Sequence, residues 1–115
     1  MSDVTIWHNP RCAKSRQTLE LLRARGVEPK IVEYLKARPS VDQLREVANK
    51  LSLKPRDMMR RKEAAWKERD LDNVRGDDDL FEAMFHEPIL IERPIVFSED
   101  SAVIGRPPEA VLAII

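Results

Sequence analysis

The stretch His8-Asn9-Pro10-Arg11-Cys12-Ala13-Lys14-Ser15-Arg16 decides the fold, because the hydrophobic pattern changes across it. Val4–Trp7, which precedes it, is a short apolar run typical of a buried strand. After it, apolar residues recur at helical spacing over residues 13–25. Cys12, the only cysteine of the chain, is therefore predicted to lie in a strand-to-helix turn, near the first turn of the helix.

This position favours a reactive Cys12 thiol. Unpaired backbone N–H groups and the helix dipole stabilise negative charge at a helix N-terminus, whether a thiolate or a bound oxyanion. Arg11, Lys14 and Arg16 add positive charge within a few residues. The alternative is a small buried hydrophobic residue, the commonest role of a lone cysteine. Three cationic neighbours favour the reactive thiol.

The residues around Cys12 exclude two classes of thiol enzyme. A dithiol oxidoreductase has Cys-x-x-Cys, but Ser15 stands at the fourth position, and a cysteine phosphatase has an arginine where this chain has Thr18. Ser15 is expected to donate a hydrogen bond to the Cys12 thiolate, to cap the start of the helix, or both. His8 either adds positive charge when protonated or is a hydrogen-bonded structural residue.

The two ends of the chain predict the strands of one sheet. A second strand is predicted at 30–34, after a left-handed helix stop at Gly26. Strand, helix and strand within this length predict a parallel pair with a right-handed crossover. Residues 93–98 and 102–104 are predicted to form a hairpin, followed by a last helix that opens at Pro107 or Pro108.

The middle of the chain, about 38–88, is predicted to be a helical insertion. Ser40-Val41-Asp42-Gln43 fits a capping box ahead of an amphipathic helix, and Pro55 suits the first turn of another. Asp77-Asp78-Asp79 is predicted to start a further helix, with its acids at the positive end of the dipole rather than in a metal site. The fold class is thus α/β: a four-stranded mixed sheet flanked by helices, in a single domain over 1–115.

Length and composition exclude several functions. The 115 residues suffice for one compact domain, and 20 basic residues balance 20 acidic ones, so nucleic-acid binding is not expected. No stretch approaches the roughly 20 apolar residues of a membrane helix, and no secretion signal is predicted. One cysteine and two distant histidines predict no metal site. We expect a cytoplasmic monomer.

Four segments along the chain carry motifs that together point to one known family. The first is the loop around Cys12, which has the form His-Asn-Pro-x-Cys-x-x-Ser-Arg. The others, in order along the chain, are Arg56-Asp57-Met58-Met59-Arg60, His86-Glu87-Pro88-Ile89-Leu90-Ile91-Glu92-Arg93-Pro94-Ile95-Val96 and Gly105-Arg106-Pro107-Pro108-Glu109. Together these segments resemble the glutaredoxin-coupled arsenate reductases, the thioredoxin-like ArsC family. The match spans almost the whole chain, with Glu87 standing between the motif's His and Pro.

The resemblance implies a thioredoxin-like fold and an oxidoreductase that reduces arsenate to arsenite. Cys12 would be the nucleophile, Arg60, Arg93 and Arg106 would bind the oxyanion, and Pro94 would be cis. Arg61 remains an alternative to Arg60, because the alignment could shift by one residue.

A chain with a lone cysteine needs an external thiol to complete the reaction. The resemblance implies glutathione as co-substrate and glutaredoxin as partner, with no bound cofactor. Two other functions remain open: a thioredoxin-like regulator that binds RNA polymerase, and a glutathione-dependent reductase of another substrate.

Overall fold

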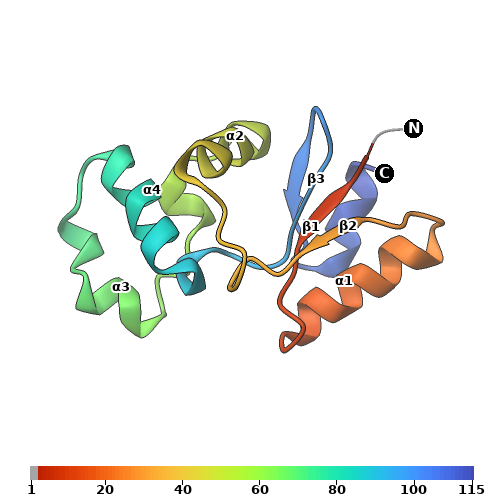
Figure 1. Ribbon diagram of the computed structural model, residues 1–115, viewed down its shortest axis with the longest axis horizontal. Helices are drawn as coiled ribbons and strands as arrows, with labels where there is room; N and C mark the ends of the chain where they lie inside the picture. Colours follow the sequence, from red (N-terminus) through yellow and green to blue (C-terminus); the bar gives the residue numbers. More distant parts are fainter. Residues whose placement is uncertain (1–2) are drawn as a thin grey trace. The chain divides into compact units, whose positions relative to one another are not determined.

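The computed structural model describes residues 3–115, which form two compact units (Figure 1). One consists of the described residues up to Ala37 together with Arg93–Ile115, and the other of Arg38–Glu92. The second unit begins where the helical insertion is predicted and extends past its predicted end. The single domain over 1–115 stays a prediction. Met1 and Ser2 lie outside the described residues. They begin the N-terminal segment in which no secretion signal is predicted.

The first unit contains the sheet. Its strands are β1 (Thr5–Trp7), β2 (Lys30–Val32), β3 (Ile95–Phe97) and β4 (Ala102–Ile104), in the order β2-β1-β3-β4. β1 is parallel to β2 and antiparallel to β3, and β3 is antiparallel to β4. The four-stranded mixed sheet with its starting parallel pair and final hairpin is confirmed. The strands at the β2 and β3 positions are shorter than predicted.

The core of this unit lies between the sheet and two helical segments. α1 (Ala13–Ala24) contributes Leu19 and Leu22, and the 3-10 helix η4 (Pro108–Ala113) contributes Val111. These side chains pack with Ile6 of β1 and Val96 of β3, all of them buried. The last helix is a 3-10 helix that starts at Pro108. Proline suits this position because the N–H groups of a first turn have no partner within the helix. This packing fixes the start of α1, and hence Cys12, against the end of β1.

The second unit is helical, as predicted. α2 (Val41–Leu51) begins with the predicted capping box: the Gln43 N–H donates to Ser40 Oγ, and the Ser40 N–H donates to Gln43 Oε1. α4 (Asp77–His86) carries the three aspartates in its first turn, and Gly76 occupies its N-cap. The aspartates therefore lie at the positive end of the helix dipole, as predicted. Gly76 has no side chain, so it cannot accept a capping hydrogen bond.

Short elements connect these helices where the sequence is least informative. Pro55 lies in the first turn of a helix, as predicted, and this helix is a single 3-10 turn. The remaining elements are α3 (Ala64–Glu68) and the 3-10 helices η1 (Pro55–Met58), η2 (Leu71–Asn73) and η3 (Pro88–Leu90). Such short turns have weak hydrophobic periodicity because each buries only one or two side chains.

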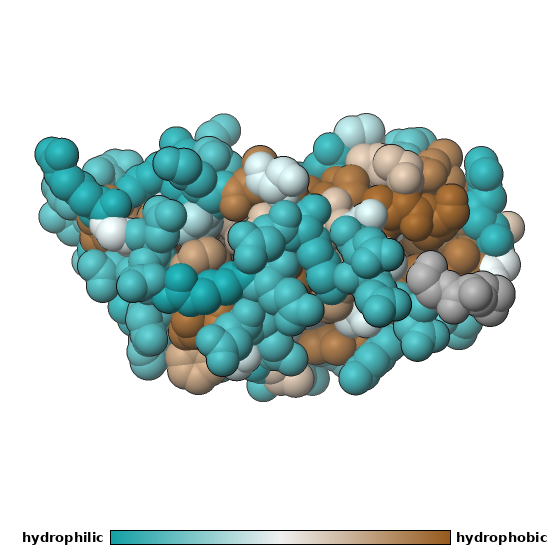
Figure 2. Space-filling view, turned by 90° about the horizontal axis from the view of Figure 1, so that it is seen from above, coloured by the Kyte–Doolittle hydropathy of each residue, from teal (hydrophilic) through white to brown (hydrophobic). Residues whose placement is uncertain are grey.

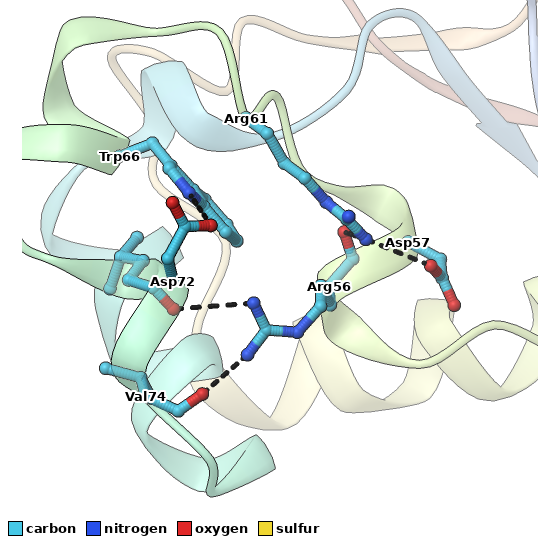
Figure 3. Close-up of polar contacts among 7 residues, drawn as sticks. Arg56, Asp57, Arg61, Trp66, Asp72 and Val74 are labelled. Atoms are coloured by element: carbon cyan, nitrogen blue, oxygen red, sulfur yellow. Dashed lines mark hydrogen bonds and ion pairs between the residues drawn. The ribbon is translucent and has the colours of Figure 1, made fainter.

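Trp66 and Arg56 hold these turns together (Figure 3). The Trp66 side chain is buried, and its Nε1–H donates to Asp72 Oδ1 at 2.9 Å. The Arg56 guanidinium lies 5.5 Å from the centre of the Trp66 ring and donates to the backbone carbonyls of Leu71 and Val74. Arg56, the first arginine of the Arg-x-x-x-Arg motif, is thus a structural residue that ties η1 to η2.

Hydrophilic side chains cover most of the face seen in Figure 2, and the hydrophobic surface there is confined to separate patches. None of the helices in residues 3–115 is long and apolar enough to cross a membrane.

Candidate functional site

Cys12 is the N-cap residue of α1. Its backbone is extended (φ −95°, ψ 122°), and its carbonyl accepts the N–H of Arg16 at 3.0 Å. Its own N–H donates to the Asn9 carbonyl at 3.0 Å, which closes the loop between β1 and α1. The predicted strand-to-helix position of Cys12 is therefore confirmed by the structure. The side chain is partly buried, so the sulfur is neither sealed in the core nor fully exposed.

The surroundings of the sulfur favour the thiolate. Partial burial alone raises the pKa of the Cys12 thiol, since a charged sulfur loses hydration. Hydrogen bonds from the backbone N–H groups of Ser15 and Lys14, together with the Arg93 guanidinium, lower it more strongly. The net effect holds the pKa of Cys12 below the ordinary thiol value. The helix N-terminus thus acts on the sulfur through specific N–H donors.

The Ser15 hydroxyl does not serve the sulfur in the way the sequence suggested. Its Oγ lies 2.7 Å from His8 Nδ1 and accepts the Asn9 backbone N–H at 3.0 Å. Ser15 supports Cys12 through its backbone N–H instead, and its hydroxyl fixes the loop. The expected capping role is also wrong, because Cys12 occupies the N-cap.

His8 is a buried, hydrogen-bonded residue. Burial lowers its pKa most, and Arg23 and Arg16 lower it further, while Glu33 raises it. The neutral imidazole is therefore favoured at neutral pH, with Nδ1 as the acceptor of the Ser15 hydroxyl. Of the two roles considered for His8, the structural one fits this geometry, and the added positive charge does not.

Two predicted arginines meet at Cys12 within the first unit. Arg106 Nη2 lies 3.9 Å from Cys12 Sγ, and Arg106 Nε donates to the Arg93 carbonyl at 2.8 Å. The Arg93 side chain hydrogen-bonds the same sulfur, and among residues 3–115 its buried Nε has no hydrogen-bond partner. A buried donor without an acceptor is costly, and an anion bound here would supply that acceptor.

Arg60, the third predicted arginine, belongs to the second unit. Its Nη1 lies 2.9 Å from Glu63 Oε2, and its Nε lies 3.7 Å from Glu92 Oε1. Its neighbour Arg61 pairs instead with Asp57 at 3.3 Å, and its guanidinium lies over the Trp66 ring (Figure 3). Arg61 therefore has the local role of a surface cation, while Arg60 is held by two carboxylates.

Arg93 and Arg106, the two arginines beside Cys12, share one backbone feature. The Arg93–Pro94 peptide bond is cis, as the resemblance implies, and so is Arg106–Pro107. Each bond follows directly on an arginine of the site. Nothing in the sequence singled out the second one.

Asn9 is the site residue that sequence reasoning left without a role. Its side-chain Oδ1 accepts the Arg11 N–H at 3.0 Å, and its carbonyl accepts the Cys12 N–H. The Asn9-Pro10 dipeptide is a known turn signal, which could have indicated this role.

The comparisons with known proteins agree with this geometry. A model of the ArsC family matches residues 7–114, nearly the whole chain. The chain belongs to the ArsC family. An arsenate reductase from Haemophilus influenzae is 47% identical over 114 residues, which cover 97% of this chain and 98% of the relative.

Two solved structures of the ArsC family have the same thioredoxin-like fold. One is an arsenate reductase from Vibrio cholerae, with a TM-score of 0.96 and 47% identity over 99% of this chain and 98% of that one. The other is a putative arsenate reductase from Yersinia pestis, with a TM-score of 0.93 and 50% identity over 97% of this chain and all of that one. The fold expected from the resemblance is thereby confirmed.

Proposed function

We propose that this ArsC-family chain is an arsenate reductase in which Cys12 is the nucleophile. The observation that supports this most is the Cys12 sulfur at the N-cap of α1, with the Arg106 guanidinium 3.9 Å away and Arg93 lowering its pKa. A thiolate and two guanidinium groups meet at one point of the first unit. We assign arsenate as the substrate because similar proteins are named arsenate reductases.

In the first step, the Cys12 thiolate attacks the arsenic of arsenate. A sulfur–arsenic bond forms, and one oxygen leaves as water after taking up protons. Arsenic remains As(V) in the resulting adduct. The planar forks of Arg93 and Arg106 match the geometry of a tetrahedral oxyanion, and they stabilise the charge that develops on its oxygens. The resemblance adds Arg60 to this set.

An external thiol then completes the reduction, because the chain has no second cysteine. Its thiolate bonds to the Cys12 sulfur, and the sulfur–arsenic bond breaks with its electron pair going to arsenic. The products are arsenite, in which arsenic is As(III), and a mixed disulfide on Cys12. A second thiol attacks that disulfide and releases the Cys12 thiolate. The two electrons gained by arsenic thus come from two thiol groups.

We assign glutathione to the first external thiol and glutaredoxin to the second, in line with the resemblance. No bound cofactor is needed, since the thiols carry the electrons. The reaction requires reduced thiols throughout, so we assign it to the cytoplasm. A monomer suffices, because Cys12, Arg93 and Arg106 come from one unit of one chain.

The test is NADPH consumption that depends on arsenate, with glutathione, glutaredoxin and glutathione reductase supplied. We expect turnover by the wild-type chain, one arsenite released per NADPH, and no turnover by the Cys12→Ser variant. Thr5→Ser, a similar change in β1, is the matched control and should keep wild-type turnover. Arsenate-independent NADPH consumption with a mixed-disulfide substrate would point to the alternative reductase. Absence of any turnover, with recovery of RNA polymerase on the immobilised chain, would point to the regulator.

A further inference from the structure

Gly105, at the end of β4, lies directly before Arg106 and is buried between two other segments of the site. We propose that Gly105 is a positioning residue: its missing side chain lets Pro94 and α1 come close enough to hold Arg93 and Arg106 beside Cys12. The proposal rests on the proposed function only where turnover is measured, because the ionisation of Cys12 tests it without arsenate.

The space beside Gly105 is too small for a methyl group. A Cβ at this residue would lie 2.8 Å from Thr18 Oγ1, 2.9 Å from Pro94 Cγ and 3.1 Å from Thr18 Cγ2. Carbon atoms in good packing are roughly 3.5–4.0 Å apart, so the neighbours would have to move by about 0.5 Å or more. By contrast, a Cβ at Gly76 would meet only Asp79 Oδ2 at 3.5 Å.

Neither neighbour of Gly105 can move freely. Thr18 is fully buried, and its hydroxyl donates to the Lys14 carbonyl at 2.8 Å. Its χ1 angle is further restricted because the side chain is β-branched and lies in a helix. Pro94 is a buried ring whose carbonyl accepts the Gly105 N–H at 2.9 Å. A methyl group at residue 105 would therefore shift the backbone of at least one segment.

Each of the three segments carries a residue of the site. Gly105 precedes Arg106, Pro94 follows Arg93, and Thr18 lies on the helix whose N-cap is Cys12. The Arg106 Nε–H bond to the Arg93 carbonyl links the first two segments, at 2.8 Å. The 3.9 Å between Arg106 Nη2 and Cys12 Sγ is already at the outer limit of contact, so a shift of a few tenths of an ångström is enough to break it.

The first variant is Gly105→Ala. We expect the pKa of Cys12, measured from the pH dependence of its alkylation by iodoacetamide, to rise toward the ordinary thiol value. Turnover with arsenate should fall about tenfold or more. The loss should appear chiefly in kcat, because a small displacement of catalytic groups lowers the rate of the chemical step more than it weakens substrate binding. A merely structural role of Gly105 would lower the midpoint of thermal unfolding without moving the pKa of Cys12. Wild-type ionisation of Cys12 in folded Gly105→Ala overturns the proposal.

A second variant makes the test independent of any folding defect in the first. Thr18→Ala removes both Thr18 atoms that the new methyl group would meet. In a Thr18→Ala background, Gly105→Ala should raise the Cys12 pKa and lower turnover less than it does in the wild type, since two of the three contacts are gone and residues in contact are energetically coupled. An equal loss in both backgrounds overturns the proposal. If Gly105→Ala alone does not fold, a folded double variant with the Cys12 pKa of Thr18→Ala supports it.

Gly76→Ala is the matched control, since it adds the same methyl group where there is room. We expect its Cys12 pKa and turnover to equal those of the wild type. A rise in the Cys12 pKa of Gly76→Ala equal to that of Gly105→Ala would overturn the proposal, because the effect would then not depend on the contacts of Gly105.

Discussion

His8 Nδ1 and Ser15 Oγ lie 2.7 Å apart, and both side chains are buried. The Ser15 hydroxyl also accepts the Asn9 N–H at 3.0 Å. One hydroxyl group thus joins the first two residues after β1 to the third residue of α1. The backbone N–H of Ser15 donates to the Cys12 sulfur, and the hydrogen bonds of the Ser15 side chain hold that N–H in place.

Ser15→Ala should therefore destabilise the chain and raise the pKa of Cys12. The variant leaves His8 Nδ1 and the Asn9 N–H without their partner, and an unsatisfied buried group costs about 1–3 kcal/mol. Urea unfolding gives the free energy of unfolding, and iodoacetamide alkylation gives the pKa. Gln17→Ala, at an exposed position of the same helix, is the control and should change neither. Wild-type stability of Ser15→Ala would contradict the network described above.

The lowered pKa of His8 predicts how stability depends on pH. Between its folded-state pKa and the higher ordinary value near 6.5, the unfolded chain binds more protons at His8 than the folded chain does. The stabilising contribution is complete above the ordinary value and is lost as the pH falls through this range. The advantage in unfolding free energy of the wild type over His8→Gln should therefore shrink between about pH 8 and about pH 5. An advantage that grows on acidification would show that His8 is stabilised as a cation.

Arg93 is expected to control the ionisation of Cys12 more than the charged side chains beside Cys12 in the sequence do. Its guanidinium hydrogen-bonds the sulfur and lowers the pKa of the thiol, so Arg93→Met should raise that pKa and reduce the fraction of Cys12 that is thiolate at neutral pH. Arg11→Met removes an exposed charge one residue from Cys12 and should have a smaller effect. The pH dependence of alkylation compares the two. Equal shifts would mean that general charge, rather than a directed contact, sets the pKa.

Local patterns predicted the parts of the fold that depend on residues close together in the sequence. The capping box of Ser40 and Gln43 fixes the start of α2 within four residues, and the position of Cys12 follows from the change of period after Trp7. These features were readable because their hydrogen bonds and apolar spacing lie within one or two turns. The 3-10 turns of the second unit carry no such signal.

The details of the site depend on contacts between distant segments, and the sequence could not supply them. Thr18 and Gly105 are 87 positions apart, yet their packing shapes the neighbourhood of Cys12. The hydroxyl of Ser15 has several partners within reach, and only the structure shows that it bonds to His8. The three arginines were singled out by family motifs, since an isolated arginine resembles any surface charge.

Arg56 and Arg61 provide a last prediction, because both guanidinium groups lie over the Trp66 ring but only one is partly buried (Figure 3). Arg56 also donates to two backbone carbonyls, at Leu71 and Val74. Arg56→Met should therefore lower the free energy of unfolding by about 2 kcal/mol, as expected for charged hydrogen bonds and a cation–π contact.

Arg61→Met should cost less than about 1 kcal/mol, because the Arg61–Asp57 pair is half exposed to solvent. Both variants should keep the wild-type pKa of Cys12, since neither residue contributes to its ionisation. Urea unfolding and iodoacetamide alkylation measure the two quantities on the same preparations. If Arg61→Met proves as destabilising as Arg56→Met, the carbonyl contacts of Arg56 contribute nothing, and contact with the Trp66 ring alone accounts for the stability of this region.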